Sequence, residues 1–349
     1  MRPLLLVVLA GLLAPALAGC VNAPGATTAG APSAMDAAMA MNVTPPKATD
    51  VLAALKGFSE AYPYRQAATP NHLAARDALE KMMKDAGLET ERQDFDTTGV
   101  VSAVPATGQN VIGIKWGQDR ERWVVVGAHY DVTEGAVYGT YDDGSGTIDV
   151  AMLAKALAHV NTTRTIAFVE FDQEERGLVG SHAFVEAVTK GTFKHKITVD
   201  AMLDLDMVGI TWPHPANLIC WQNSPSLENE TRTLANASKI PADHLEFRKP
   251  KGGSSDGASF IAAGIATAYF WSDWDEYVLP DGQVAPVTSG YVGTYPWWHK
   301  VDTYDTMVAS AGDEATLAAG FQTTLNLVTP LILYMAGPTF TPDGVQPAK

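Results

Sequence analysis

Short apolar runs and longer amphipathic runs alternate along most of the chain. RWVVVGAH (122–129) and TIAFVEF (165–171) are apolar runs of strand length, whereas 147–160 and 178–190 place apolar residues at helical spacing. Apolar strands that alternate with helices predict an α/β fold, because such strands are buried on both faces of their sheet. We expect a three-layer sandwich: a mostly parallel or mixed central sheet of about eight strands with helices on both faces. The expected strands are 89–95, 110–116, 122–129, 165–171, 201–208, 217–221 and 265–271, and the expected helices are 48–62, 71–87, 147–160, 178–190, 226–237 and 313–335.

The N-terminus has a pattern of its own. Arg2 precedes an apolar stretch at 4–17, which is too short to span a bilayer comfortably and is typical of a signal peptide. The letters LAGC at 17–20 resemble a bacterial lipobox, which implies cleavage before Cys20 and lipid on that cysteine. We expect an exported protein that is lipid-anchored on the periplasmic or cell-surface side of a bacterial membrane, or else a soluble secreted protein. The expected parts are a lipoprotein signal peptide at 1–19, a flexible tether at 20–46 and a single folded domain at 47–340.

Charge and cysteine content narrow the possible partners. The formal net charge is −15, from 39 acidic and 24 basic residues. A nucleic-acid partner is therefore not expected, because phosphate binding needs a basic face. Cys20 and Cys220 are the two cysteines in the sequence, so a lipidated Cys20 leaves Cys220 without a disulfide partner. The membrane is expected to be contacted only through the lipid, and the sequence leaves the oligomeric state open.

Histidines and carboxylates gather where the expected strands end. His129 and Asp131 follow one strand and the pair Glu174-Glu175 follows the next. In open α/β sheets, sites form beyond the carboxyl ends of the strands, so these side chains are expected to converge. Taken singly each has an ordinary explanation, and Asp142-Asp143 before a helix is also typical of an N-cap. The other candidates in this group are Asp142, Asp143, Asp204, Asp206 and His299.

Convergence of so many carboxylates favours bound cations. Unpaired carboxylates at one sheet edge would repel one another and would be costly to desolvate. Histidine nitrogen together with carboxylate oxygen suits zinc. Two zinc ions would balance three carboxylates and one hydroxide, and paired metals occur in hydrolases. The sequence therefore predicts two Zn²⁺ ions per chain.

Five motifs in this order resemble the M28 family of zinc peptidases, which includes bacterial leucyl-type aminopeptidases. They are GAHYD (127–131), YDDGSG (141–146), DQEERGLVGS (172–181), LDMVG (205–209) and WWHKVDT (297–303), within a region of about 105–335. By position, the resemblance implies that His129, Asp142, Glu175, Asp206 and His299 bind the metals, with Asp142 as the bridging ligand.

The same resemblance assigns roles to two carboxylates that do not bind metal. Asp131 would orient the ring of His129. Glu174 would be the general base that takes a proton from the metal-bridging water and delivers it to the leaving amine. The implied activity is that of a co-catalytic di-zinc exopeptidase with a peptide substrate. An aminopeptidase that removes apolar N-terminal residues is favoured over a carboxypeptidase.

The substrate pocket departs from the family pattern. Trp298 replaces the tyrosine that commonly precedes the last histidine, and the family's SDH reads Ser255-Asp256-Gly257. The indole N–H of Trp298, or Tyr291 or Tyr295 from the aromatic segment 272–298, could stabilise the oxyanion instead. We expect Trp298, Tyr291, Tyr295 and Asp256 to line the pocket.

Three other functions stay open at this point. GSSDG (253–257) matches the G-x-S-x-G pattern of serine hydrolases, with Ser255 as nucleophile and His299 as base, but the residues before it are charged and do not resemble a buried strand. Glutaminyl cyclases share the expected architecture and hold one zinc. A non-catalytic surface lipoprotein is the third alternative. The peptidase predicts two zinc ions per chain, the glutaminyl cyclase one and the surface lipoprotein none.

Overall fold

The computed structural model describes residues 43–97, 107–211, 218–241, 244–248, 255–272 and 295–345. The chain divides into two units, 1–32 and 33–349, and every described residue belongs to the second. Cys20 and Tyr291 lie outside the described residues. The limits expected for the signal peptide, the tether and the folded domain therefore stay predictions.

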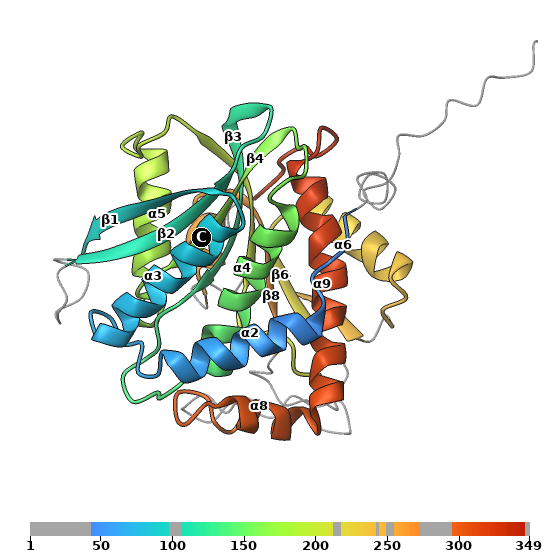
Figure 1. The fold of residues 1–349 in the computed structure, drawn as a ribbon. Helices are drawn as coiled ribbons and strands as arrows, with labels where there is room; N and C mark the ends of the chain where they lie inside the picture. The colour runs from blue at the N-terminus through green and yellow to red at the C-terminus, as the bar shows by residue number, and fades with distance from the viewer. Residues whose placement is uncertain are drawn as a thin grey trace, which may run out of the picture. The chain divides into compact units, whose positions relative to one another are not determined.

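A mixed sheet forms the centre of the described part (Figure 1). It has eight strands in the order β1-β2-β4-β3-β5-β8-β6-β7. The neighbours β4-β3, β3-β5, β5-β8 and β6-β7 are parallel, and the other three pairs are antiparallel. The strands are β1 Glu89–Asp96, β2 Thr107–Lys115, β3 Asp119–His129, β4 Arg164–Phe171, β5 Thr198–Leu205, β6 Leu218–Gln222, β7 Leu245–Arg248 and β8 Ala266–Trp271.

Helices cover both faces of this sheet, which confirms the expected α/β class. One apolar cluster joins the sheet to six helices on one face, and a smaller cluster joins it to two helices on the other. The six are α2 Ala48–Ala61, α3 Pro70–Asp85, α4 Ser145–Leu157, α6 Pro225–Ala237, α8 Tyr304–Ala311 and α9 Glu314–Ala336, and the two are α5 Val179–Thr189 and α7 Gly257–Ala262.

The central strands provide a rigid base for the loops at their ends. In β3, Val124 and Val126 pack in the larger cluster while Val125 packs in the smaller one, and all three are fully buried. Burying a side chain of this size contributes roughly 1.5–3 kcal/mol. Successive residues of a strand point to opposite faces, so a strand in the middle layer is apolar throughout, as RWVVVGAH indicated.

The sequence pattern missed the short elements at the margins. Strand β7 has the sequence LEFR, whose alternation is weak because it lies at the edge of the sheet and two of its four residues are charged.

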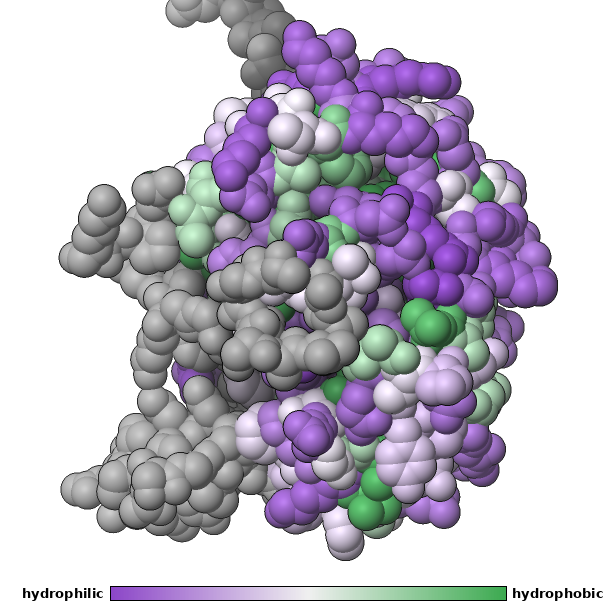
Figure 2. All heavy atoms as spheres, turned by 90° about the vertical axis from the view of Figure 1, so that its left-hand side faces the viewer, coloured by the Kyte–Doolittle hydropathy of each residue, from purple (hydrophilic) through white to green (hydrophobic). Residues whose placement is uncertain are grey.

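At the other edge, β1 carries mostly exposed or half-buried polar residues, and the face on which it lies is largely hydrophilic (Figure 2). Polar edge strands resist pairing with other chains.

Helix α9 is apolar because it belongs to the core. Of the described helices it alone has the length and composition to cross a membrane, yet 67% of its most apolar window is buried inside the fold. Leu325, Val328 and Leu331 are fully buried in the larger cluster. Packing therefore accounts for its hydropathy.

Candidate metal centre

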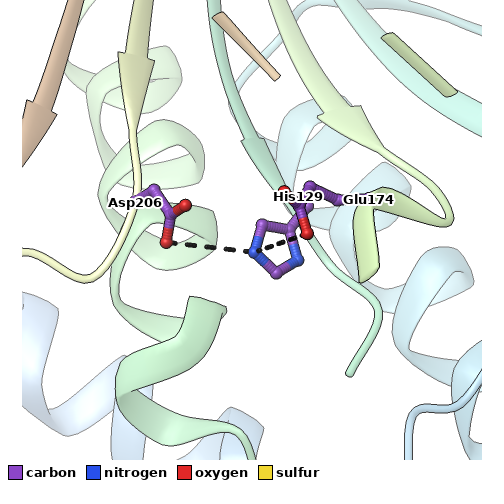
Figure 3. Close-up of side chains that lie close together, drawn as sticks. All are labelled: His129, Glu174 and Asp206. Atoms are coloured by element: carbon purple, nitrogen blue, oxygen red, sulfur yellow. Dashed lines mark ion pairs between the residues drawn. The ribbon is translucent and has the colours of Figure 1, made fainter. Parts of the chain in front are cut away.

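The loops that follow β3, β4 and β5 lie at the carboxyl ends of these central strands, and they bring histidine and carboxylate side chains together. His129 is the last residue of β3, and Asp206 directly follows β5. Glu174 and Glu175 begin the short 3-10 helix η2 (Glu174–Arg176), three residues after β4. Figure 3 shows His129 between Glu174 and Asp206, with its Nε2 atom 3.9 Å from a carboxylate oxygen of each. The parallel strands β4, β3 and β5 are neighbours, so their carboxyl ends supply one site.

Asp142 lies between the two histidines. Its Oδ1 atom is 3.4 Å from His129 Nε2, and its Oδ2 atom is 3.2 Å from His299 Nε2. Glu175 Oε2 is also 3.2 Å from His299 Nε2. The side chains thus form two adjoining groups that share Asp142 as the link. Potential ligand atoms lie within 4.8 Å of one another in each of the groups His129–Glu174–Asp206 and Asp142–Glu175–His299.

Hydrogen bonds to the Asp302 carboxylate fix the segment that carries Asp142. This segment is the one-turn element η1 (Thr140–Gly144), in which the Asp142–Asp143 peptide is cis. The Oδ2 atom of Asp302 accepts hydrogen bonds from the backbone N–H groups of Tyr141 (2.7 Å) and Asp142 (3.0 Å). Asp302 lies three residues after His299, so one carboxylate fixes both segments relative to each other.

Two further carboxylates support the candidate ligands without joining either group. Asp131 Oδ1 is 3.5 Å from His129 Nδ1 and accepts a hydrogen bond from the Glu174 N–H at 3.0 Å. This arrangement leaves His129 Nε2 facing the carboxylates, as the expected orienting role of Asp131 requires. Asp143 accepts hydrogen bonds from Gly146 N–H (2.9 Å) and Met207 N–H (3.1 Å), so it caps α4 and ties it to the segment after β5.

The electrostatics of the cluster suit cations. Burial raises the pKa of Asp206 to about 7 although His129 opposes the shift, and burial raises the pKa of Glu174 well above its ordinary value. Burial lowers the pKa of His299, but Asp142 and Glu175 outweigh it and raise that pKa to about 9. Asp206 Oδ1 is buried with no hydrogen-bond partner among the described residues. Two nitrogen donors and buried carboxylates in these groups match the ligand set that zinc prefers, so the residues fit the metal.

A cavity of about 260 Å³ opens onto the two groups, and apolar side chains form part of its wall. Leu178, Met207, Trp271 and Trp298 supply that part, and the Trp298 ring stacks on His299. Trp298 therefore forms part of the wall of this cavity. Trp271 was not expected from the sequence, although its position as the last residue of β8, at the carboxyl ends of the strands where the site lies, could have indicated it.

Three residues singled out from the sequence are not among the described residues that line this cavity. Tyr295 is buried, and its hydroxyl donates a hydrogen bond to Asp302 Oδ1, so it supports the η1 segment and does not line the wall. Asp256 is fully buried and is not among the described residues that line the cavity. Ser255 lies two residues before α7 and is 1% exposed, which leaves it no access for a nucleophilic attack.

The described fold and site define an α/β protein with a candidate zinc centre beyond the carboxyl ends of its central strands. The sequence profile described as "Peptidase family M28" matches residues 110–320, which is more than half of the chain. The chain therefore belongs to peptidase family M28.

Individual relatives agree with this family. Aminopeptidase YwaD of Bacillus subtilis is 31% identical over 196 residues, which are 54% of this chain and 41% of that protein. The chain spans about half the length of the curated relatives it matches. Among solved structures, the zinc aminopeptidase BSAP of Bacillus subtilis aligns with a TM-score of 0.66 at 19% identity, over 87% of this chain and 99% of that one. A glutaminyl cyclase from an Acidobacteriales bacterium aligns with a TM-score of 0.63 at 19% identity, over 84% of this chain and 96% of that one. The fold is therefore common to both activities.

Proposed function

We propose that the protein is a zinc exopeptidase with two metal ions per chain, and that it acts as an aminopeptidase. The observation that carries this proposal is the position of Asp142, whose two carboxylate oxygens face His129 and His299 separately. A carboxylate placed in this way is suited to bridge two cations. His129 and Asp206 would complete one metal site, and Glu175 and His299 would complete the other.

Bound zinc would polarise the peptide carbonyl and lower the pKa of a water molecule to about 7. Glu174 is placed to move the proton. Its carboxylate lines the cavity beside His129 Nε2, and its backbone N–H is fixed by Asp131. As a general base, Glu174 would accept a proton from the attacking water and pass it to the leaving amine.

The charge of the cavity supports an aminopeptidase over a carboxypeptidase. Four carboxylates, those of Asp142, Glu174, Glu175 and Asp206, line it, and no lysine or arginine lines it among the described residues. Zinc would balance the charges of Asp142, Glu175 and Asp206. The support for an aminopeptidase therefore comes from the described part of the wall, which offers no lysine or arginine to pair with the free carboxylate of a carboxypeptidase substrate.

The apolar part of the wall supports a preference for apolar N-terminal residues. Leu178, Met207, Trp271 and Trp298 lie together in the cavity, next to the two metal groups. Pockets that accept apolar side chains are lined in this way, with a few polar groups that fix the orientation of the ligand. A preference for acidic or basic residues in a panel of amino-acid p-nitroanilides would contradict this assignment.

Turnover of Leu-p-nitroanilide tests the proposal. We expect purified protein to cleave it, to lose the activity on removal of metal by a chelator, and to regain it when zinc is added. A serine hydrolase would keep its activity with the chelator and lose it with a fluorophosphonate. A glutaminyl cyclase would instead cyclise peptides with an N-terminal glutamine and would not release p-nitroaniline.

We also propose that the protein is exported and held on a bacterial membrane by lipid on Cys20. Support comes from the sequence alone, in the apolar stretch at 4–17 and the LAGC that ends at residue 20. A tether at 20–46 would then let the domain reach peptides near the membrane surface.

A further inference from the structure

A buried arginine holds both ends of the loop that connects two candidate metal ligands. Arg65 is fully buried, and its guanidinium donates hydrogen bonds to four backbone carbonyls. Nε donates to Tyr130 O at 2.9 Å, Nη2 donates to Gly139 O at 2.9 Å, and Nη1 donates to Tyr138 O at 2.5 Å. The fourth acceptor, Tyr62 O, is 3.3 Å from Nη1 and lies on the same segment as Arg65.

The contacted carbonyls lie at the two ends of one loop. Tyr130 directly follows His129, and Gly139 lies three residues before Asp142. Arg65 thus joins the start of the loop to its end. A backbone hydrogen bond also connects Arg65 to the loop, because Val132 N–H donates to Arg65 O at 3.2 Å. The positions of His129 and Asp142 relative to each other depend on how this loop is closed.

The end of the loop has little freedom to move away from Arg65. Gly139 has φ 51°, which favours glycine, and a Cβ atom there would lie 2.6 Å from Asp142 O and 3.3 Å from Arg65 Nη2. The chain therefore passes close to the guanidinium just before Asp142. Because residue 139 is a glycine, the chain can come close enough to Arg65 for Nη2 to donate its hydrogen bond to Gly139 O.

The charge of Arg65 is not matched by a direct ion pair among the described residues. Taking an unpaired ion out of water costs several kcal/mol, so a buried guanidinium needs another source of stabilisation. Burial lowers the pKa of Arg65 to about 10, and the negative field of Asp302, Asp131 and the η1 aspartates opposes that shift. The guanidinium is therefore charged at neutral pH. It also lies over the Phe58 ring, 4.9 Å from the centroid.

We propose that Arg65 is a positioning residue for the metal centre, which sets the separation of His129 and Asp142 by closing the 130–139 loop. The inference rests on the metal sites of the proposed function. Arg65 lies before the residues that match the family profile, 110–320, so nothing in that match assigns it a role. Its rigid fork of donors suits this task because it reaches several carbonyls in one plane.

Zinc affinity of Arg65→Met and Arg65→Lys tests the proposal. Affinity is measured by competition between the metal-free protein and a chromophoric chelator, with no peptide present. We expect Arg65→Met to bind zinc about 10–100-fold more weakly than the wild type, as is usual when a residue that orients ligands is removed. Arg65→Lys keeps the charge but loses the planar fork, so its loss should be smaller and still measurable.

Arg164→Met is the matched control. Arg164 is also buried, donates to backbone carbonyls such as Phe340 O (2.9 Å) and lies over an aromatic ring. It differs from Arg65 in its ion pair with Asp200, and it is at the opposite end of β4 from the metal groups. Both Met variants should lower the melting temperature of the metal-free protein, and Arg164→Met should keep wild-type zinc affinity. If Arg65→Met does not fold, Arg65→Lys decides the question.

Two results would overturn the positioning role. One is wild-type zinc affinity in every Arg65 variant that folds, and the other is an equal loss of affinity in Arg164→Met. A wild-type protein that binds zinc but releases no amino acid would refute the proposed function and leave this inference intact. Peptide cleavage by wild type with unchanged zinc affinity in the Arg65 variants would refute the inference alone.

Discussion

Glu174 and Glu175 are adjacent in the chain, yet their carboxylates face different histidines. Glu174 Oε2 lies 3.9 Å from His129 Nε2, and Glu175 Oε2 lies 3.2 Å from His299 Nε2. The turn that begins at Gln173, with φ 62°, separates the two side chains. The Glu175 carboxylate is also fixed by a hydrogen bond, because its Oε1 atom accepts from Thr133 N–H (3.1 Å).

This separation predicts different defects for the two glutamates. We expect Glu174→Gln to keep wild-type zinc content and to lower kcat by at least about 10²-fold, because a general base contributes 10²–10⁴-fold. Glu175→Gln should lose zinc, because it removes a charged ligand. Zinc content by mass spectrometry and kcat on Leu-p-nitroanilide are measured on the same samples. Equal zinc loss in the two variants would refute the division of roles.

The wall of the cavity predicts which substrates depend on Trp271. Replacing Trp271 by Ala removes apolar contact for a large side chain, so kcat/KM for Leu-p-nitroanilide should fall about tenfold more than for Ala-p-nitroanilide. Trp297→Ala is the control, since Trp297 is 41% exposed and does not line the cavity. An equal effect of Trp271→Ala on both substrates would show that this residue does not set the preference.

The position of the candidate ligands could be predicted because it follows from topology. His129 ends β3, Asp206 directly follows β5, and Glu175 lies four residues after β4. The apolar runs of these strands are plain in the sequence, and the carboxyl ends of neighbouring parallel strands lie together. The mixed sheet and the main helices follow from the same periodicity. Helices α7 and α8, of six and eight residues, were not predicted, because so short a run shows little of the helical period.

The supporting residues could not be predicted in this way. Arg65 and Asp302 act through backbone groups that are distant in the sequence, and no hydrophobic periodicity indicates such contacts. Tyr295 was expected in the pocket because aromatic residues are frequent in 272–298, but a buried hydroxyl needs a partner, and Asp302 provides it. Composition indicated a wall of aromatic residues without indicating which of them form it.

Asp149 predicts a pH dependence of stability. This residue of α4 is fully buried, neither of its oxygens has a hydrogen-bond partner among the described residues, and burial raises its pKa well above the ordinary value. The folded state therefore keeps a proton that the unfolded state releases above about pH 4, so Asp149 makes folding less favourable as pH rises towards the folded pKa.

Replacement of Asp149 by Asn removes this proton uptake. Relative to wild type, Asp149→Asn should gain about 1.4 kcal/mol of unfolding free energy per pH unit over that range. Urea unfolding of the metal-free proteins at pH 5 and pH 6 measures the change, with Asp85→Asn on the exposed face of α3 as control. The account is contradicted if the difference between Asp149→Asn and wild type is the same at both pH values.

Cys20 predicts the location of the protein. With the intact leader, the wild type should be found in the membrane fraction of a bacterial host, whereas Cys20→Ser should be released in soluble form because lipid has no attachment site. Cys220→Ser is the control, since Cys220 is buried in the fold. Membrane association of Cys20→Ser at the wild-type level would rule out the lipid anchor.

The zinc content of the purified, catalytically active wild-type chain tests the central claim most directly. Native mass spectrometry counts the ions on each chain, and His299→Ala provides the comparison. We predict two zinc ions per wild-type chain and one in His299→Ala, because that histidine belongs to one of the two groups that Asp142 links. A single zinc in the fully active wild type, or none, would contradict the dinuclear centre.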